Sequence, residues 1–308
     1  MYYYNIFNKI FSTNKQLPVP LCAVNTPNNI SAKIIFVSSE HIFKKYETLK
    51  KQIGRSLYKV EIGYVIIKDK TKFLIDKFTR YILIYCGDDC EKVIIYLLGE
   101  VLSLFFRLRN RYQLHACMLN KNNTTIVLCG SSGNGKSTLA NVFSNEGWNM
   151  LCDDHSIVYE KEDIFWGVPS FPYLKLYLNE INHTKHNLSV KICDVNKGLV
   201  SITDFSTKEV YEKDYRITYV FFLNLDCKNN IEIGSNKLDC DASFKMLIES
   251  SYGNLRSNGD TYLLFKDIEY LSMLKKMSEN IPGYQLSFSK KNTPKQVVEY
   301  IKKLVGEI

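Results

Sequence analysis

Residues 124–143 read TTIVLCGSSGNGKSTLANVF, and this stretch decides the fold. Its first six residues are β-branched or apolar and predict a buried strand, whereas residues 137–143 predict the start of a helix of about nine residues. Between them, residues 130–137 match the pattern G-x-x-x-x-G-K-[ST]. Strand, glycine-rich loop and helix in this order form the context in which such a loop binds phosphate.

The chemistry of the loop assigns roles to its residues. Its glycines let the backbone approach an anion, and the first N–H groups of the helix point at that anion. Lys136 would reach the β- and γ-phosphates, and the Ser137 hydroxyl would ligate Mg²⁺. We therefore expect a site for ATP and Mg²⁺, with binding residues Gly130, Ser131, Ser132, Gly133, Asn134, Gly135, Lys136, Ser137 and Thr138.

Two adjacent aspartates follow the helix. Residues 148–152 predict a short strand that ends at Asp153 and Asp154. Because the helix is short, this strand would return close to the loop and bring both carboxylates near the γ-phosphate. One carboxylate could hold Mg²⁺ while the other accepts a proton from an attacking hydroxyl, and the residues alone leave open which does which.

These segments carry a family resemblance. Leu114-His115-Ala116, the loop through Thr138, and Asp153-Asp154 resemble the core of HPr kinase/phosphorylase-type proteins, which share a nucleotide-binding fold with phosphoenolpyruvate carboxykinase. The match covers about residues 91–160, with weaker echoes in 167–172 and 281–286. The resemblance implies a serine kinase in which Lys136 and His115 lie beside the phosphates. It also implies that Asp153 or Asp154 is the general base and that the other lies nearer the metal. We favour Asp153 as the base, which leaves Asp154 with Ser137 at the metal.

The chain departs from bacterial HPr kinases after the aspartate pair. It lacks their Glu-x-Arg-Gly signature and their arginine- and proline-containing loop, which argues against a reverse phosphorylase reaction and against HPr as substrate. The chain length and segment 171–176 are closer to HPr-kinase-like proteins that phosphorylate a serine of ribosomally made peptides, such as the lasso-peptide kinases. The resemblance thus implies an ATP-dependent serine kinase for a peptide or small protein.

Two other functions stay open, namely a nucleotide-binding regulatory module that hydrolyses ATP slowly, and a kinase for a small metabolite. The paired aspartates favour the kinase, because a pure binding module needs no base beside the γ-phosphate. Phosphoryl transfer also needs cations around the transferred group. The downstream candidates are Lys175, Arg216 and Arg256.

Composition limits the class of protein. The 308 residues are 45% apolar, enough for a sizeable core, and the formal charge of +8 is spread along the chain without a basic tract. We expect anionic small partners but no nucleic acid. The most apolar stretch, residues 93–106, contains Glu100 and is too short for a membrane span, and the nine cysteines form no CxxC pair. We expect a soluble, cytoplasmic enzyme without a membrane partner; its oligomeric state stays open.

The predicted organisation has two parts and an α/β fold with a mixed sheet around the nucleotide. Residues 1–110 form a smaller α+β region whose first 30 residues are irregular, and residues 111–308 form the kinase domain. Predicted strands cover 31–38, 60–68, 72–75, 80–85, 112–119, 124–129, 156–160, 164–168, 189–192, 200–205 and 217–223. Predicted helices cover 42–52, 91–109, a region from 242–249, and a C-terminal helix capped by Thr293 with Pro294 and Gln296.

Overall fold

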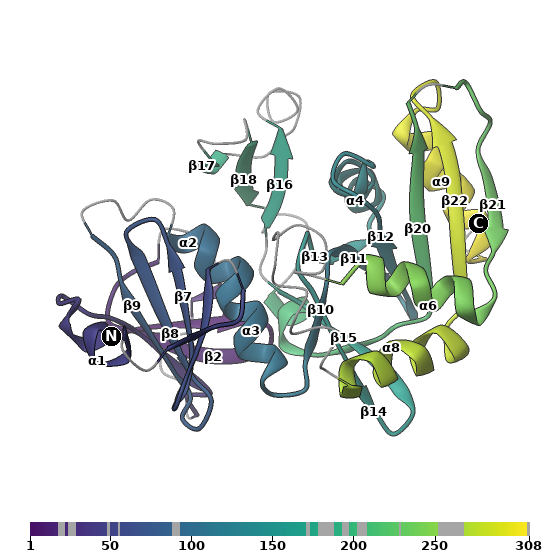
Figure 1. Cartoon of the computed structure of the whole chain (residues 1–308). Coiled ribbons are helices and arrows are strands. Elements are labelled where there is room, and N and C mark those ends of the chain that lie inside the picture. The colour runs from purple at the N-terminus through teal and green to yellow at the C-terminus, as the bar shows by residue number, and fades with distance from the viewer. Residues whose placement is uncertain are drawn as a thin grey trace. The chain divides into compact units, whose positions relative to one another are not determined.

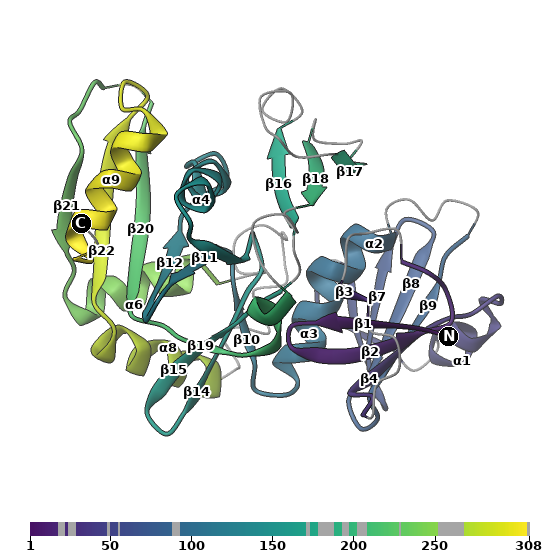
Figure 2. The same cartoon turned by 180° about the vertical axis from the view of Figure 1, so that it is seen from behind.

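The computed structural model describes residues 1–17, 22–23, 29–47, 50–54, 56–87, 93–170, 173–177, 188–192, 197–201, 208–227, 229–251 and 268–306. The chain divides into two compact units, drawn in Figures 1 and 2. The first unit comprises Met1–Tyr112 and Tyr252–Tyr270, and the second Gln113–Ser251 and Leu271–Ile308. The inclusion of Tyr252–Tyr270 in the first unit was not predicted, and the boundary at residues 110 and 111 stays a prediction.

A nine-stranded sheet forms the centre of the first unit, with strand order β3-β1-β2-β4-β9-β8-β7-β6-β5. Most neighbours are antiparallel, but β4 pairs in parallel with both β2 and β9. The strands are β1 (Tyr2–Ile6), β2 (Lys9–Thr13), β3 (Cys22–Ala23), β4 (Ala32–Phe36), β5 (Lys51–Gln52), β6 (Leu57–Val60), β7 (Gly63–Lys68), β8 (Thr71–Asp76) and β9 (Tyr81–Tyr85).

Helices cover both faces of this sheet. On one face, the continuous helix made of α2 (Val93–Tyr96), η1 (Leu97–Val101) and α3 (Leu102–Arg107) packs its aromatic rings against the strands, and the centroids of Phe7 and Phe106 lie 5.1 Å apart. On the other face, α1 (His41–Glu47) buries Phe43 against Val65 and Leu74. The predicted helix 91–109 is therefore confirmed over its described part, with a π-helical turn at its centre.

The N-terminal 30 residues differ from the prediction. Instead of an irregular arm, β1 and β2 form a hairpin whose two turn residues, Phe7 and Asn8, have φ angles of 51° and 52°. Tyr4, Ile6 and Phe11 are buried in it. Prolines and asparagines farther along this segment masked the alternation of buried and exposed residues that marks a strand.

A mixed six-stranded sheet forms the centre of the second unit, with order β13-β11-β12-β20-β22-β21. The predicted mixed α/β sheet is confirmed, because β12 pairs in parallel with β20 and β20 with β22, whereas the other pairs are antiparallel. The strands are β11 (Ala116–Lys121), β12 (Thr124–Cys129), β13 (Asn149–Cys152), β20 (Tyr219–Asp226), β21 (Gly234–Lys237) and β22 (Gly283–Ser289).

Two helices pack on one face of this sheet, α4 (Lys136–Asn145) and α9 (Pro294–Leu304) (Figure 1). Leu139 and Phe143 of α4 and Val298 of α9 share one apolar core with alternate residues of the strands. The predicted cap of the C-terminal helix is confirmed, since Thr293 and Gln296 form a capping box and Pro294 follows the cap. The core holds α4, and hence the glycine-rich loop before it, against the sheet.

Smaller elements complete the second unit. A four-stranded sheet contains β10 (Tyr112–Leu114), β14 (Ser156–Lys161), β15 (Ile164–Val168) and β19 (Tyr215–Arg216), and a three-stranded sheet contains β16 (Tyr173–Tyr177), β17 (Leu188–Ile192) and β18 (Lys197–Ser201). Among the described residues, the other helices are η2 (Lys208–Glu212), α6 (Cys240–Glu249) and α8 (Ile268–Asn280), whose first three residues belong to the first unit. No described helix is both long and apolar enough to cross a bilayer.

Several predicted elements are corrected. The helix expected over residues 42–52 ends at Glu47, and Lys51–Gln52 is the strand β5. The strand expected over residues 60–68 is divided between β6 and β7.

The strand expected over residues 112–119 breaks at His115 into β10 and β11, which belong to different sheets. His115 donates its backbone N–H to Ser250 O (2.7 Å) instead of continuing either ladder. The strand expected over residues 200–205 begins earlier, at Lys197, and its part beyond Ser201 lies outside the described residues.

Candidate functional site

The glycine-rich loop opens onto a helix start that has no side-chain cap. Gly133 and Gly135 have φ angles of 91° and 84°, a region that residues with a side chain rarely adopt. Gly135 is the N-cap of α4, and no side chain accepts a hydrogen bond from the first turn of the helix there. Backbone N–H groups at such a helix start are a ready site for an anion. The loop itself, from Ser131 to Gly133, is exposed.

Lys136 is folded into the loop that precedes it. Its side chain is buried, and Nζ donates to Gly130 O (2.8 Å) and more weakly to Ser131 O (3.4 Å). The third neighbour is His115 Nε2, at 3.0 Å. A lysine whose ammonium group is held among loop carbonyls lies where it can also reach phosphates bound by the same loop.

His115 connects Lys136 to the aspartate pair. Because an ammonium group only donates, His115 Nε2 accepts this hydrogen bond, so Nδ1 carries the proton of the neutral ring. That nitrogen faces Asp154 Oδ1 at 3.7 Å. The break between β10 and β11 thus places an imidazole between the loop lysine and a carboxylate.

The two aspartates have different surroundings. Asp153 is 1% exposed, and its Oδ1 accepts hydrogen bonds from the Ser137 hydroxyl (2.9 Å) and the Cys117 thiol (2.7 Å). Asp154 adopts a φ of 64°, which turns the chain after β13, and 18% of its side chain stays exposed. Asp153 therefore faces inward toward the start of α4, whereas Asp154 lies nearer to solvent.

Sequence reasoning missed the role of Cys117. The residue is two positions after His115 on β11, and it belongs to none of the motifs that mark the site in the sequence. Burial raises its pKa well above the ordinary value, and the negative charge of Asp153 raises it further. The thiol therefore stays protonated and donates to Asp153, and only the contact itself reveals this.

The structure places some of the predicted site residues together and others apart. The structure brings together Lys136, Ser137, His115, Asp153 and Asp154, as the sequence predicted. Asn134 instead anchors the loop, donating its side-chain amide to Leu223 O (2.7 Å). Among the candidate cations, Arg216 is exposed on β19, whereas Arg256 and the side chain of Lys175 lie outside the described residues.

A divalent cation would find oxygen ligands here. Across the described ranges, no three His, Cys, Asp or Glu side chains are grouped so that they could hold a metal without help. Ser137 Oγ and Asp153 Oδ1 are hard oxygen donors 2.9 Å apart at the helix start, and Mg²⁺ commonly takes one or two protein ligands together with phosphate oxygens. The donor set therefore fits Mg²⁺ bound together with a nucleotide.

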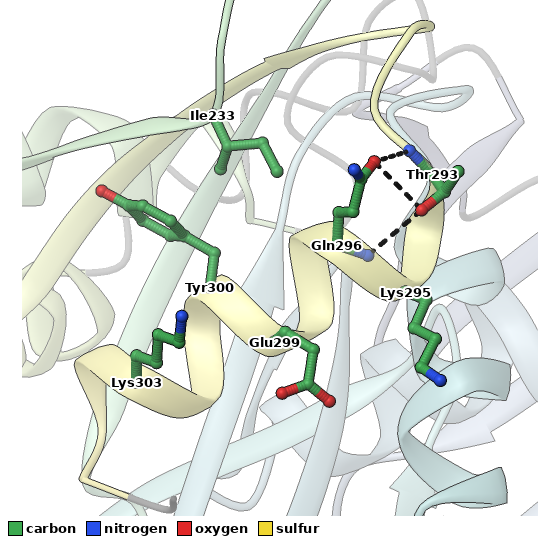
Figure 3. A pocket seen from close by; sticks show the side chains of 7 residues that line it. All are labelled: Ile233, Thr293, Lys295, Gln296, Glu299, Tyr300 and Lys303. Carbon is green, nitrogen blue, oxygen red and sulfur yellow. Dashed lines mark hydrogen bonds between the residues drawn. The ribbon is translucent and has the colours of Figure 1, made fainter.

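A hollow beside α9 has a volume of about 360 Å³. Figure 3 shows Gln296 turned toward Thr293, with which it forms the capping box. The polar groups at this helix start are thus bonded to one another. The lining residues, none of them predicted for the site, are Ile233, Thr293, Lys295, Gln296, Glu299, Tyr300 and Lys303.

Comparison with known proteins gives similarity to solved structures but no match in sequence. No protein-family model matches the chain, and no curated protein matches it. Among solved structures, the chain is similar to the Hpr(Ser) kinase/phosphatase from Coxiella burnetii, with a TM-score of 0.36 and 11% sequence identity. The match covers 63% of this chain and 97% of that chain. Values this low assign no activity to the present chain.

Proposed function

We propose that the chain is an ATP- and Mg²⁺-dependent kinase that transfers the γ-phosphate to a serine hydroxyl of a peptide or small protein. In its narrowest form, the acceptor is a ribosomally made peptide of the lasso type. One observation carries the proposal: Lys136, His115 and Asp154 form a chain of contacts that begins in a loop suited to phosphate and ends at a partly exposed carboxylate.

Binding would use the loop and its lysine. The uncapped N–H groups of α4 would donate to the phosphate oxygens, aided by the helix dipole, while Lys136 Nζ would add a positive charge. Gly130, Ser131, Ser132, Gly133 and Asn134 would line the phosphates with backbone atoms. Ser137 and Thr138 follow Lys136 in the first turn of α4.

The two carboxylates would have different roles, one in binding Mg²⁺ and the other in accepting a proton. Ser137 and Asp153 would hold Mg²⁺, which supplies charge neutralisation at the β- and γ-phosphate oxygens when bound. Asp154 would accept the proton of the serine hydroxyl while the serine oxygen attacks the γ-phosphorus, the bond to the bridging oxygen breaks, and ADP leaves. This assignment reverses the roles favoured from the sequence, because Asp154 is the more exposed carboxylate and Asp153 is bonded to Ser137.

His115 would orient both neighbours. Its neutral ring would accept a hydrogen bond from Lys136 and direct Nδ1–H toward Asp154, which would orient that carboxylate for proton transfer. Protonation of the ring would place two positive charges 3.0 Å apart and break the contact with Lys136. The proposed role therefore requires neutral His115.

The test is phosphate transfer to serine peptides, followed by mass spectrometry, with Asp153→Asn and Asp154→Asn compared at increasing Mg²⁺. We expect Asp154→Asn to lower kcat by about 10²–10⁴-fold at unchanged Mg²⁺ dependence. We expect Asp153→Asn to raise the Mg²⁺ concentration needed for half-maximal rate. ATP binding with ADP release but without any phosphopeptide would favour the slow-ATPase module. Unchanged transfer in both variants would refute the site.

A further inference from the structure

The net charge of the chain is segregated rather than spread. Residues 1–112 contain 18 Lys and Arg against 9 Asp and Glu, a formal charge of +9. Residues 113–308 contain 22 Lys and Arg against 23 Asp and Glu, a formal charge of −1. Segment Tyr252–Tyr270, which also belongs to the first unit, contains two Lys and Arg against three Asp and Glu, so the first unit has a formal charge of +8 and the second unit of 0. The charge forms no basic tract, but it is concentrated in the first unit, and its positive potential attracts anionic partners.

The positive charge is placed unfavourably at one edge of the nine-stranded sheet. Strand β5 ends the strand order, and Lys51 on it lies directly opposite Lys59 of β6 in the antiparallel register. Both side chains are exposed. Like charges directly opposite each other destabilise a strand pair, and acidic side chains beside them would relieve this cost. Lysine on a short edge strand also protects the edge from aggregation, so an added strand must supply opposite charge to pair there.

Among the side chains that the structure describes, no ion pair joins Lys51 or Lys59 to a carboxylate. Two other lysines of the same sheet do have such a partner, Lys68 with Glu100 (2.8 Å) and Lys72 with Glu40 (2.6 Å). Beside the edge, Lys50 Nζ lies 4.7 Å from the ring centroid of Tyr58 and adds a third positive charge. We define Lys50, Lys51 and Lys59 as the lysine edge.

We propose that the lysine edge docks an acidic, extended peptide segment, which in the proposed function would belong to the serine-bearing acceptor. An extended segment can pair its backbone with the open side of β5, and its carboxylates can neutralise the facing lysines. Because side chains alternate along a strand, acidic residues at every second position would lie on the sheet face that carries Lys51, directly beside Lys51 and one strand farther from Lys59. A second copy of the chain fits poorly, since its own first unit is equally basic.

A direct test is binding of a fluorescein-labelled peptide of twelve residues that alternates Glu and Val, measured by anisotropy on the full chain without nucleotide. We expect Lys51→Glu/Lys59→Glu to weaken binding about tenfold or more. The control Lys44→Glu/Lys45→Glu makes the same charge change on exposed positions of α1 and should leave affinity within about twofold. Equal losses in both double variants would overturn the proposal.

Three further measurements sharpen the test. Proline in place of the valines should abolish tight binding, because an X–Pro segment cannot donate to β5. Lys51→Glu alone should raise Tm while weakening binding of the peptide, since an ion pair with Lys59 would replace the like-charge pair.

Tighter binding of a twelve-nucleotide oligo-dT than of the peptide would overturn the proposal of a peptide partner in favour of nucleic acid. Because no nucleotide is present, a failure here leaves the phosphotransfer assay as an independent test of the proposed function.

Discussion

The first backbone N–H groups of a helix have no acceptor within the helix, and α4 and α9 of the second unit differ in how these groups are satisfied. At α9, Thr293 and Gln296 satisfy the first backbone N–H groups from within the chain. At α4, Gly135 takes the N-cap in a left-handed conformation and offers no side chain. A capping box stabilises a helix by itself, whereas an uncapped start is stabilised only when a ligand supplies the acceptor. This difference is the reason why the proposed phosphate site lies at the start of α4 and not at the start of α9.

The largest effect is expected from removing the charge at the uncapped start. Lys136→Ala should weaken ATP binding and lower phosphate transfer by about a hundredfold or more, because Nζ is the positive charge held inside the loop. Calorimetry with MgATP and the mass assay measure the two losses. Lys245→Ala, at an exposed position of α6, is the control and should behave like the unchanged protein. Full transfer by Lys136→Ala would remove the loop from the mechanism.

A smaller effect is expected from straining the same start. Gly135→Ala should destabilise the fold by about 1 kcal/mol, because φ is 84° there, and should also weaken ATP binding about tenfold as the helix start shifts. Gly147→Ala is a matched control, since Gly147 has a φ of 81° just beyond the other end of α4 and equally open surroundings. If both variants bind ATP alike, the conformation at Gly135 does not matter for the ligand.

At the capped start we expect a change in stability alone. Thr293→Ala removes the acceptor for the Gln296 N–H and should lower the free energy of unfolding by about 1 kcal/mol. ATP affinity should be unchanged, and Thr293→Ser should restore stability. Denaturant unfolding and calorimetry on the same samples separate the two quantities. A weaker ATP affinity in Thr293→Ala would show that the two helix starts are not independent.

The smallest effect on ATP binding is expected from treatment with a thiol reagent, because Cys129, which ends β12 just before the loop, is buried. Burial raises its pKa to about 12, so the thiol stays protonated and unreactive at neutral pH. Iodoacetamide at pH 8 should modify the exposed Cys227 and Cys240, spare Cys129, and leave ATP binding unchanged. Because the unfolded thiol loses its proton near pH 9.0, stability should fall as pH rises from there toward 12. If iodoacetamide modified Cys129 and ATP binding were lost, the burial of this thiol beneath the glycine-rich loop would be contradicted.

Local sequence signals predicted the parts of the fold that depend on neighbouring residues. The alternation and apolar content of residues 124–129 and the Thr293 capping box both appear as expected. The break at His115 was missed, because it arises from Ser250, far away in the sequence. The Cys117–Asp153 contact and the facing lysines of β5 and β6 were missed for the same reason, since strand register is a tertiary property.

The most direct test of the central claim is amide hydrogen exchange with and without MgATP. The account predicts slower exchange at residues 133–138, where the uncapped N–H groups of α4 would donate to phosphate, and no change at residues 295–298 of the capped helix. No protection at residues 133–138, or equal protection at both helix starts, would contradict a nucleotide site at this loop.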